Sequence, residues 1–121
     1  MAVSNLILTA LATNLFQDTV SANAAVVIKA ATGTFYVIHV DNSLCAAPSF
    51  VKLWDLAAAV VVGTTVPDWV IKVPAAFKGN VLVATAGIVF TLGLQVATVT
   101  TGGTAGVASP AAAVVVSIAY T

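Results

Sequence analysis

The stretch that decides the fold is residues 34–56, TFYVIHVDNSLCAAPSFVKLWDL. Two runs rich in β-branched and aromatic residues, 34–40 and 49–56, flank a polar connection that contains Pro48. Such runs favour β-strands, and a proline between them keeps the connection out of the sheet. The stretch therefore predicts two strands, and it also holds the only histidine and the only cysteine of the chain.

Alternation along a strand assigns a face to each side chain. In the first run Tyr36, Ile38 and Val40 share the face that we expect in the core, and in the second run Val51 and Leu53 do so. The opposite face is mixed, because a tryptophan and two phenylalanines accompany a histidine and a lysine. We expect this mixed face to dock on another subunit. The candidate interface residues are Phe35, His39, Phe50, Lys52 and Trp54.

The rest of the chain repeats the strand pattern. Residues 24–30 and 34–40 are separated by a short turn and predict a hairpin, and Gly87 interrupts a strand pattern in the way that marks a bulge. Further strands are expected at 68–73, 81–86, 88–92, 94–100 and 111–120. About eight short strands at regular spacing predict an all-β, single-domain β-sandwich, jelly-roll-like, over residues 24–121. Residues 1–23 combine a leucine stripe with turn formers, and they predict an N-terminal arm or a first strand.

The composition is unusually apolar. Hydrophobic residues make up 60% of the 121 residues and charged ones 7%, against roughly 45–50% and 25% in an average soluble domain. Every charged residue is Lys or Asp and the net charge is zero, so the chain lacks the basic footprint of a nucleic-acid-binding protein. Such a composition favours a surface that neighbouring subunits cover.

A membrane helix is the alternative use of so much apolar sequence. Residues 81–99 are long enough to span a bilayer. Glycine and threonine interrupt them, however, and no Lys/Arg cluster flanks them to set an orientation. We therefore expect no membrane association.

Catalytic and metal-binding patterns are weak. His39 and Asp41 share a strand face, but one histidine and one cysteine are too few for a structural zinc site. Cys45 lies among apolar residues with no cation nearby that would activate it, which favours a buried structural thiol. We expect no enzyme activity, no metal and no cofactor. Trp54 and Trp69 suit either packing or stacking on sugars.

Several phrases, taken in order, resemble a family of small tailed-bacteriophage virion structural proteins. The phrases are YVIHVDNS (36–43), VKLWD (51–55), GTTVPD (63–68), KVPA (72–75), GIVFTLGL (87–94) and TTGGTAG (100–106). The resemblance covers roughly residues 24–120 and implies an all-β capsid decoration (cement) protein located on the capsid surface of the virion. It implies no catalytic residues.

The partners that this resemblance implies are the major capsid protein and further copies of the chain. Symmetric oligomers are the default for such modules, and we favour a trimer with a dimer left open. A tail or baseplate structural protein, and a host-glycan-binding attachment protein, remain the alternatives.

Overall fold

The computed structural model describes residues 12–22 and 24–121. Over these residues the chain forms eight β-strands and no helix. The strands are β1 (Asn14–Thr19), β2 (Val26–Lys29), β3 (Gly33–Asp41), β4 (Ser49–Trp54), β5 (Trp69–Val73), β6 (Lys78–Phe90), β7 (Leu94–Val99) and β8 (Val115–Tyr120).

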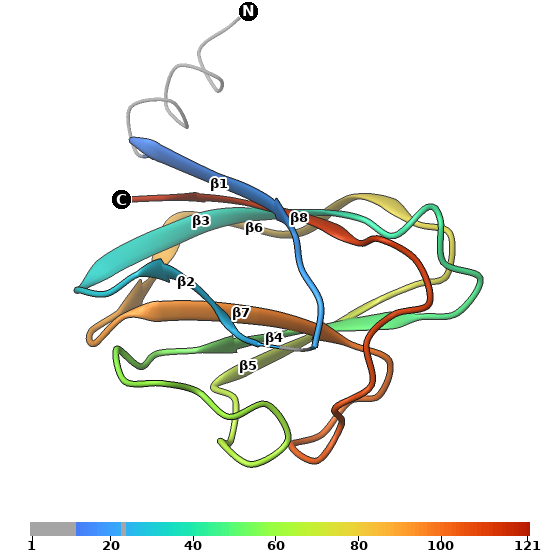
Figure 1. The fold of residues 1–121 in the computed structure, drawn as a ribbon. Helices are drawn as coiled ribbons and strands as arrows, with labels where there is room; N and C mark the ends of the chain where they lie inside the picture. Colours follow the sequence, from blue (N-terminus) through green and yellow to red (C-terminus); the bar gives the residue numbers. More distant parts are fainter. Residues whose placement is uncertain (1–11, 23) are drawn as a thin grey trace, which may run out of the picture.

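The strands form two antiparallel sheets that pack face to face (Figure 1). Sheet A has the order β1-β8-β3-β6, and sheet B has the order β2-β7-β4-β5. The ladders β1·β8, β2·β7, β3·β6 and β4·β5 are nested, so the chain is one long antiparallel ribbon that turns back between β4 and β5. Rolling this ribbon up brings β8 against β3 and β7 against β4. This arrangement is a jelly roll, and it confirms the predicted all-β, jelly-roll-like sandwich.

The N-terminal region contributes β1 to sheet A. Of the two predictions for residues 1–23, the first strand holds for Asn14–Thr19, which pairs with β8 without a break in register. The sandwich therefore begins before residue 24. Residues 1–11 and 23 lie outside the described part of the chain.

The core lies between the two sheets and contains most of the predicted residues. Ile38 and Val40 of β3 and Val51 and Leu53 of β4 are fully buried in one cluster. Near the end of the chain, the even-numbered side chains from residue 112 to residue 120 also lie in or against this cluster. These are Ala112, Val114, Val116, Ile118 and Tyr120.

At the start of β3 the prediction is wrong by one position. Phe35 is buried in the core cluster, whereas Tyr36 is buried outside it and lies against Gly87 of β6. The ladders of β3 change register between Phe35 and Val37, so an extra residue reverses the alternation there. Phe35 is consequently a core residue that stacks on Phe90, with ring centroids 6.3 Å apart.

Two further expectations about the strands are corrected. Residues 24–30 and 34–40 do not form a hairpin, because β2 pairs with β7 in sheet B and β3 pairs with β6 and β8 in sheet A. The predicted strands 81–86 and 88–92 are parts of one long strand, β6, which is irregular near Gly87 as predicted. Gly87 has a φ of 78°, a conformation that favours glycine.

Candidate interaction surface

Two loops of the chain cover the outer face of sheet B, at the bottom of the molecule in Figure 1. The Trp54 indole Nε1 donates a hydrogen bond to the Thr65 carbonyl at 3.0 Å. The amide of Gln95, opposite Trp54 on β7, donates to the carbonyls of Leu56 at 2.7 Å and Ala58 at 2.8 Å. These bonds hold the loop 55–68 against the sheet.

Lys52 holds the second loop. Its ammonium donates to the carbonyls of Thr104 at 3.3 Å and Gly106 at 2.9 Å, and its side chain is 0% exposed. Burial lowers the pKa of Lys52, because removing an ammonium group from water disfavours its charged form. The loop 100–106 is thus anchored over β4 by a buried cation.

The predicted docking face is therefore not an open surface. Phe35 lies in the core, and Lys52 and Trp54 are buried beneath loops of their own chain. Phe50 is half-buried on the same face as Lys52. Of the five candidate residues, only His39 lies on the outer face of sheet A, where it is half-buried on β3. Among the described residues, no loop is hydrogen-bonded over that face in the way that the two loops cover sheet B. The mixed composition of 50–54 reflects intramolecular packing on both sides of β4.

The outer face of sheet A has a different character. Strand pairing places Leu15, Ala119, Val37 and Val83 in one row across β1, β8, β3 and β6. Leu15 is 67% exposed and Val83 is 54% exposed. The next row contains only uncharged polar side chains and the histidine, and its members are Gln17, Ser117, His39 and Asn80. We call the two rows together the open face.

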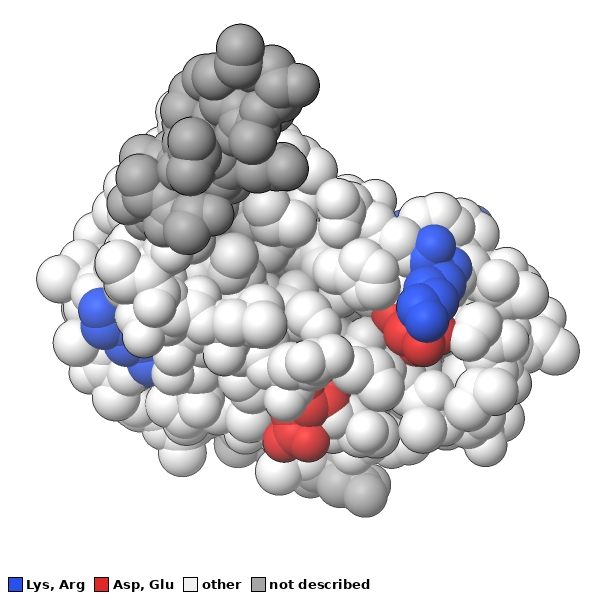
Figure 2. All heavy atoms as spheres, turned by 90° about the horizontal axis from the view of Figure 1, so that it is seen from above, with Lys and Arg blue, Asp and Glu red and all other residues white. Residues whose placement is uncertain are grey.

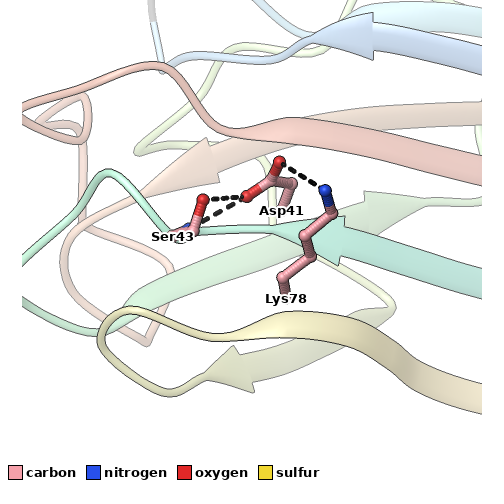
Figure 3. Close-up of polar contacts among 3 residues, drawn as sticks. All are labelled: Asp41, Ser43 and Lys78. Carbon is pink, nitrogen blue, oxygen red and sulfur yellow. Dashed lines mark hydrogen bonds and ion pairs between the residues drawn. The ribbon is translucent and has the colours of Figure 1, made fainter.

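Charged side chains are scarce on this side of the molecule (Figure 2). One ion pair lies on β3 and β6 beside the open face, where Lys78 Nζ is 3.7 Å from Asp41 Oδ2. The hydroxyl and the N–H of Ser43 donate to Asp41 at 2.5 and 3.0 Å (Figure 3) and hold the pKa of Asp41 below its ordinary value. An exposed pair of this kind adds little to stability, so it serves chiefly to mark the edge of an uncharged area.

A cleft of about 290 Å³ opens between the edge strand of each sheet, β5 and β6. It is mostly apolar, and Trp69 at its wall meets Phe35 edge to face, with ring centroids 5.2 Å apart. Asp68 adds a carboxylate at the rim, but its Oδ2 accepts the N–H of Asp55 at 2.7 Å. The lining residues are Phe35, Asp68, Trp69, Val70, Ile71, Leu82 and Ile88.

Of the titratable residues singled out in the sequence, His39 and Asp41 lie two residues apart on β3. Cys45 is buried, and its thiol lies 3.5 Å from the carbonyl of Ala112. Across residues 12–22 and 24–121, no three His, Cys, Asp or Glu side chains lie close enough to bind one metal ion. The same residues contain no helix with the length and hydropathy that crossing a membrane requires.

The open face was only partly accessible to sequence reasoning. Alternation along β3 does place Val37 beside His39 on one face. Leu15 lies in the N-terminal region, where the sequence assigned no face, and its neighbours across the sheet depend on strand order.

Comparison with protein-family models, curated proteins and solved structures found no match to the chain.

Proposed function

We propose that this protein is a capsid decoration (cement) protein of a tailed bacteriophage, and that its open face docks on the major capsid protein. In this role it is a structural component of the virion, located on the capsid surface, and it catalyses no reaction. The proposal combines the ordered sequence phrases with the chemistry of the open face.

The observation that carries the proposal is the apolar row across sheet A. An antiparallel sheet with one solvated face normally presents polar side chains outward. Here Leu15 and Val83 are exposed at the two edges of the sheet, with Val37 and Ala119 between them. Contiguous exposed apolar surface marks interaction sites, and the centres of protein interfaces are depleted of charged residues.

The fold supports the same role by analogy. Jelly rolls are the architecture of many viral capsid and lectin domains, although the fold alone does not define a function. Two packed sheets, with loops bonded over one of them, give a preorganised body. Such a body can bridge neighbouring capsid subunits with little loss of conformational entropy on binding.

The energetic effect of docking follows from the buried area. Removing apolar surface from water contributes roughly 25 cal/mol per Å², before the cost of association is subtracted. With so few charges on the open face, little desolvation of charged groups opposes this gain. A bound copy therefore stabilises the joint that it covers, and particles that carry it resist heat better than particles stripped of it.

The test is quantitative mass spectrometry of purified particles, with heads and tails separated before digestion. The proposal predicts a fixed stoichiometric ratio of this chain to the major capsid protein in the head fraction. Recovery with the tails alone would identify a tail or baseplate protein. Recovery only from the host-cell lysate would refute a structural role in the particle.

Host-glycan binding is the second candidate, and the cleft between β5 and β6 is the observation that favours it. Trp69 and Asp68 supply an aromatic ring and a carboxylate there, a combination that suits sugar rings. Trp54 does not belong to such a site, because its indole is bonded to Thr65 and is 1% exposed. Binding of the purified chain to host surface glycans, reduced by Asp68→Asn, would favour this candidate.

A further inference from the structure

Four edge strands remain in the two sheets, and three of them carry features that oppose pairing with another strand. Strand β2 has only four residues and an irregular register after Val27. Strand β5 lies between Pro67 and Pro74 and carries the exposed Lys72. Strand β6 begins at Lys78 and is broken by register shifts.

Strand β1 has none of these features. Its six residues, NLFQDT, contain no proline, no lysine and no glycine, and they pair with β8 in an unbroken register. Every residue of β1 except Phe16 is exposed. Regular edges of this kind, unpaired among the described residues, are templates for an additional strand.

The phase of the ladder shows which backbone groups face outward. The N–H of Val20 donates to the carbonyl of Val114 at 2.9 Å, in the same register as the β1·β8 ladder. Since hydrogen-bonded pairs alternate along an antiparallel ladder, Phe16 and Asp18 also turn their backbone groups toward β8. Leu15, Gln17 and Thr19 therefore turn theirs to the open edge.

The contact of Thr19 agrees with this phase. Its N–H donates to the carboxylate of Asp18 at 2.8 Å, so it points away from β8. This local bond competes with an incoming strand at one end of the edge. Within the described residues, the outward N–H groups of Leu15 and Gln17 donate no such local hydrogen bond.

We propose that two copies of this chain associate through antiparallel pairing of their β1 edges, with Gln17 of each copy on the twofold axis. This inference does not depend on the role in a virus particle. The three outward-facing residues are centred on Gln17, so this register places Leu15 opposite Thr19 of the second copy. Asp18 then lies opposite Phe16, and the two carboxylates do not oppose each other. Pairing joins two four-stranded sheets into one continuous sheet across the dimer.

An antiparallel pairing of identical strands closes with twofold symmetry. It therefore predicts a dimer, where the sequence favoured a trimer. The open faces of both copies then lie on the same side of the joined sheet, so dimerisation leaves them available for docking.

Proline substitution tests the pairing on the full-length purified chain. Gln17→Pro removes an N–H that points away from β8, so β1 keeps its ladder and the domain folds. In analytical ultracentrifugation we expect the wild type to be a dimer and Gln17→Pro a monomer with an unchanged circular dichroism spectrum. A wild-type chain that sediments as a trimer, or a Gln17→Pro variant that is still a dimer, would overturn the proposal.

Cysteine crosslinking tests the register and also captures a weak dimer. Gln17→Cys places two thiols opposite each other across the axis, within the Cα separation that a disulfide allows. We expect Gln17→Cys to form disulfide-linked dimers under mild oxidation at least tenfold faster than Val61→Cys, an exposed loop control. Leu15→Cys should crosslink to Thr19→Cys when the two variants are mixed, and to itself no faster than the control. Equal rates for Gln17→Cys and Val61→Cys would refute the pairing.

Discussion

The indole Nε1 of Trp54 donates a hydrogen bond to the backbone carbonyl of Thr65 at 3.0 Å, and this bond fixes a loop over the outer face of β4. The tryptophan thereby becomes part of the interior of the chain. The residues that looked most like a docking surface in the sequence instead hold the protein's own loops in place. The docking surface that we propose is therefore the outer face of the other sheet.

Trp54→Asp should strongly destabilise the fold. The substitution removes a buried ring and leaves a charge without a partner, at a cost of about 3–5 kcal/mol or more, which is a large part of the stability of a small domain. Urea unfolding measures the effect. Val66→Asp lies on the same loop, where the side chain is 70% exposed. Its urea midpoint should be close to that of the wild type. Similar midpoints for both variants would show that Trp54 is not buried in solution.

The carboxylate of Asp55 should make stability depend on pH. Burial would raise its pKa, but the N–H groups of Thr91, Leu92 and Gly93 outweigh this effect and lower the pKa. A lowered folded-state pKa means that the stabilisation is complete above the ordinary value of 3.8 and is lost as the pH falls below it. Asp55→Asn should therefore lose about 2 kcal/mol at neutral pH.

The same variant provides the control for this prediction. As the pH falls below 3.8, the carboxylate of the unfolded chain is protonated first and that of the folded chain only at its lowered pKa, so the difference in unfolding free energy between the wild type and Asp55→Asn should shrink. Denaturant melts at neutral and acidic pH measure the difference. A gap that stays constant over this range would mean that the charge of Asp55 is not what the turn binds.

Replacing the buried cation of Lys52 should release the glycine-rich loop. Lys52→Met keeps the length of the side chain but removes the bonds to the Thr104 and Gly106 carbonyls, at a cost of about 1–3 kcal/mol. Hydrogen exchange should accelerate in residues 100–106 while the strands stay protected. Lys72→Met, at an exposed position on β5, is the matched control and should leave the loop protected.

A side chain at Gly87 should destabilise the fold. A Cβ there would lie 2.3 Å from Cγ2 of Thr34 and 2.7 Å from Cε1 of Tyr36, in a residue with a φ of 78°. Gly87→Ala should cost about 1–3 kcal/mol. Gly103→Ala separates backbone strain from steric conflict. Gly103 has a similar φ of 83°, but a Cβ there would have no atom within 4 Å. In thermal unfolding, Gly87→Ala should have a clearly lower melting temperature than Gly103→Ala. The reverse order would contradict the packing at β6.

Sequence reasoning predicted the fold class because strand alternation is a local property. Ile38 and Val40, and Val51 and Leu53, were assigned to the core correctly from alternation alone. The exchange of Phe35 and Tyr36 depended on a bulge, which is set by the partner strands and leaves no signal in β3 itself. The hairpin at 31–33 was wrong because a turn marks a change of direction but not the sheet that the next strand joins.

The interaction surface could not be predicted for a related reason. Lys52 and Trp54 look solvent-facing in the sequence, and only the loops folded over them make them interior residues. Conversely, the row from Leu15 to Val83 joins positions far apart in the chain through strand order. Both outcomes are set by tertiary packing.

The most direct test of the proposed role is binding of the purified chain to phage capsids that lack it. Val83→Asp places a charge on the open face, and Val61→Asp makes the same change at a similarly exposed loop position, with exposures of 54% and 58%. Both variants should fold, as judged by circular dichroism. We predict that the wild type and Val61→Asp cosediment with capsids at a fixed ratio and that Val83→Asp does not. Equal binding of the two variants would contradict docking through the open face.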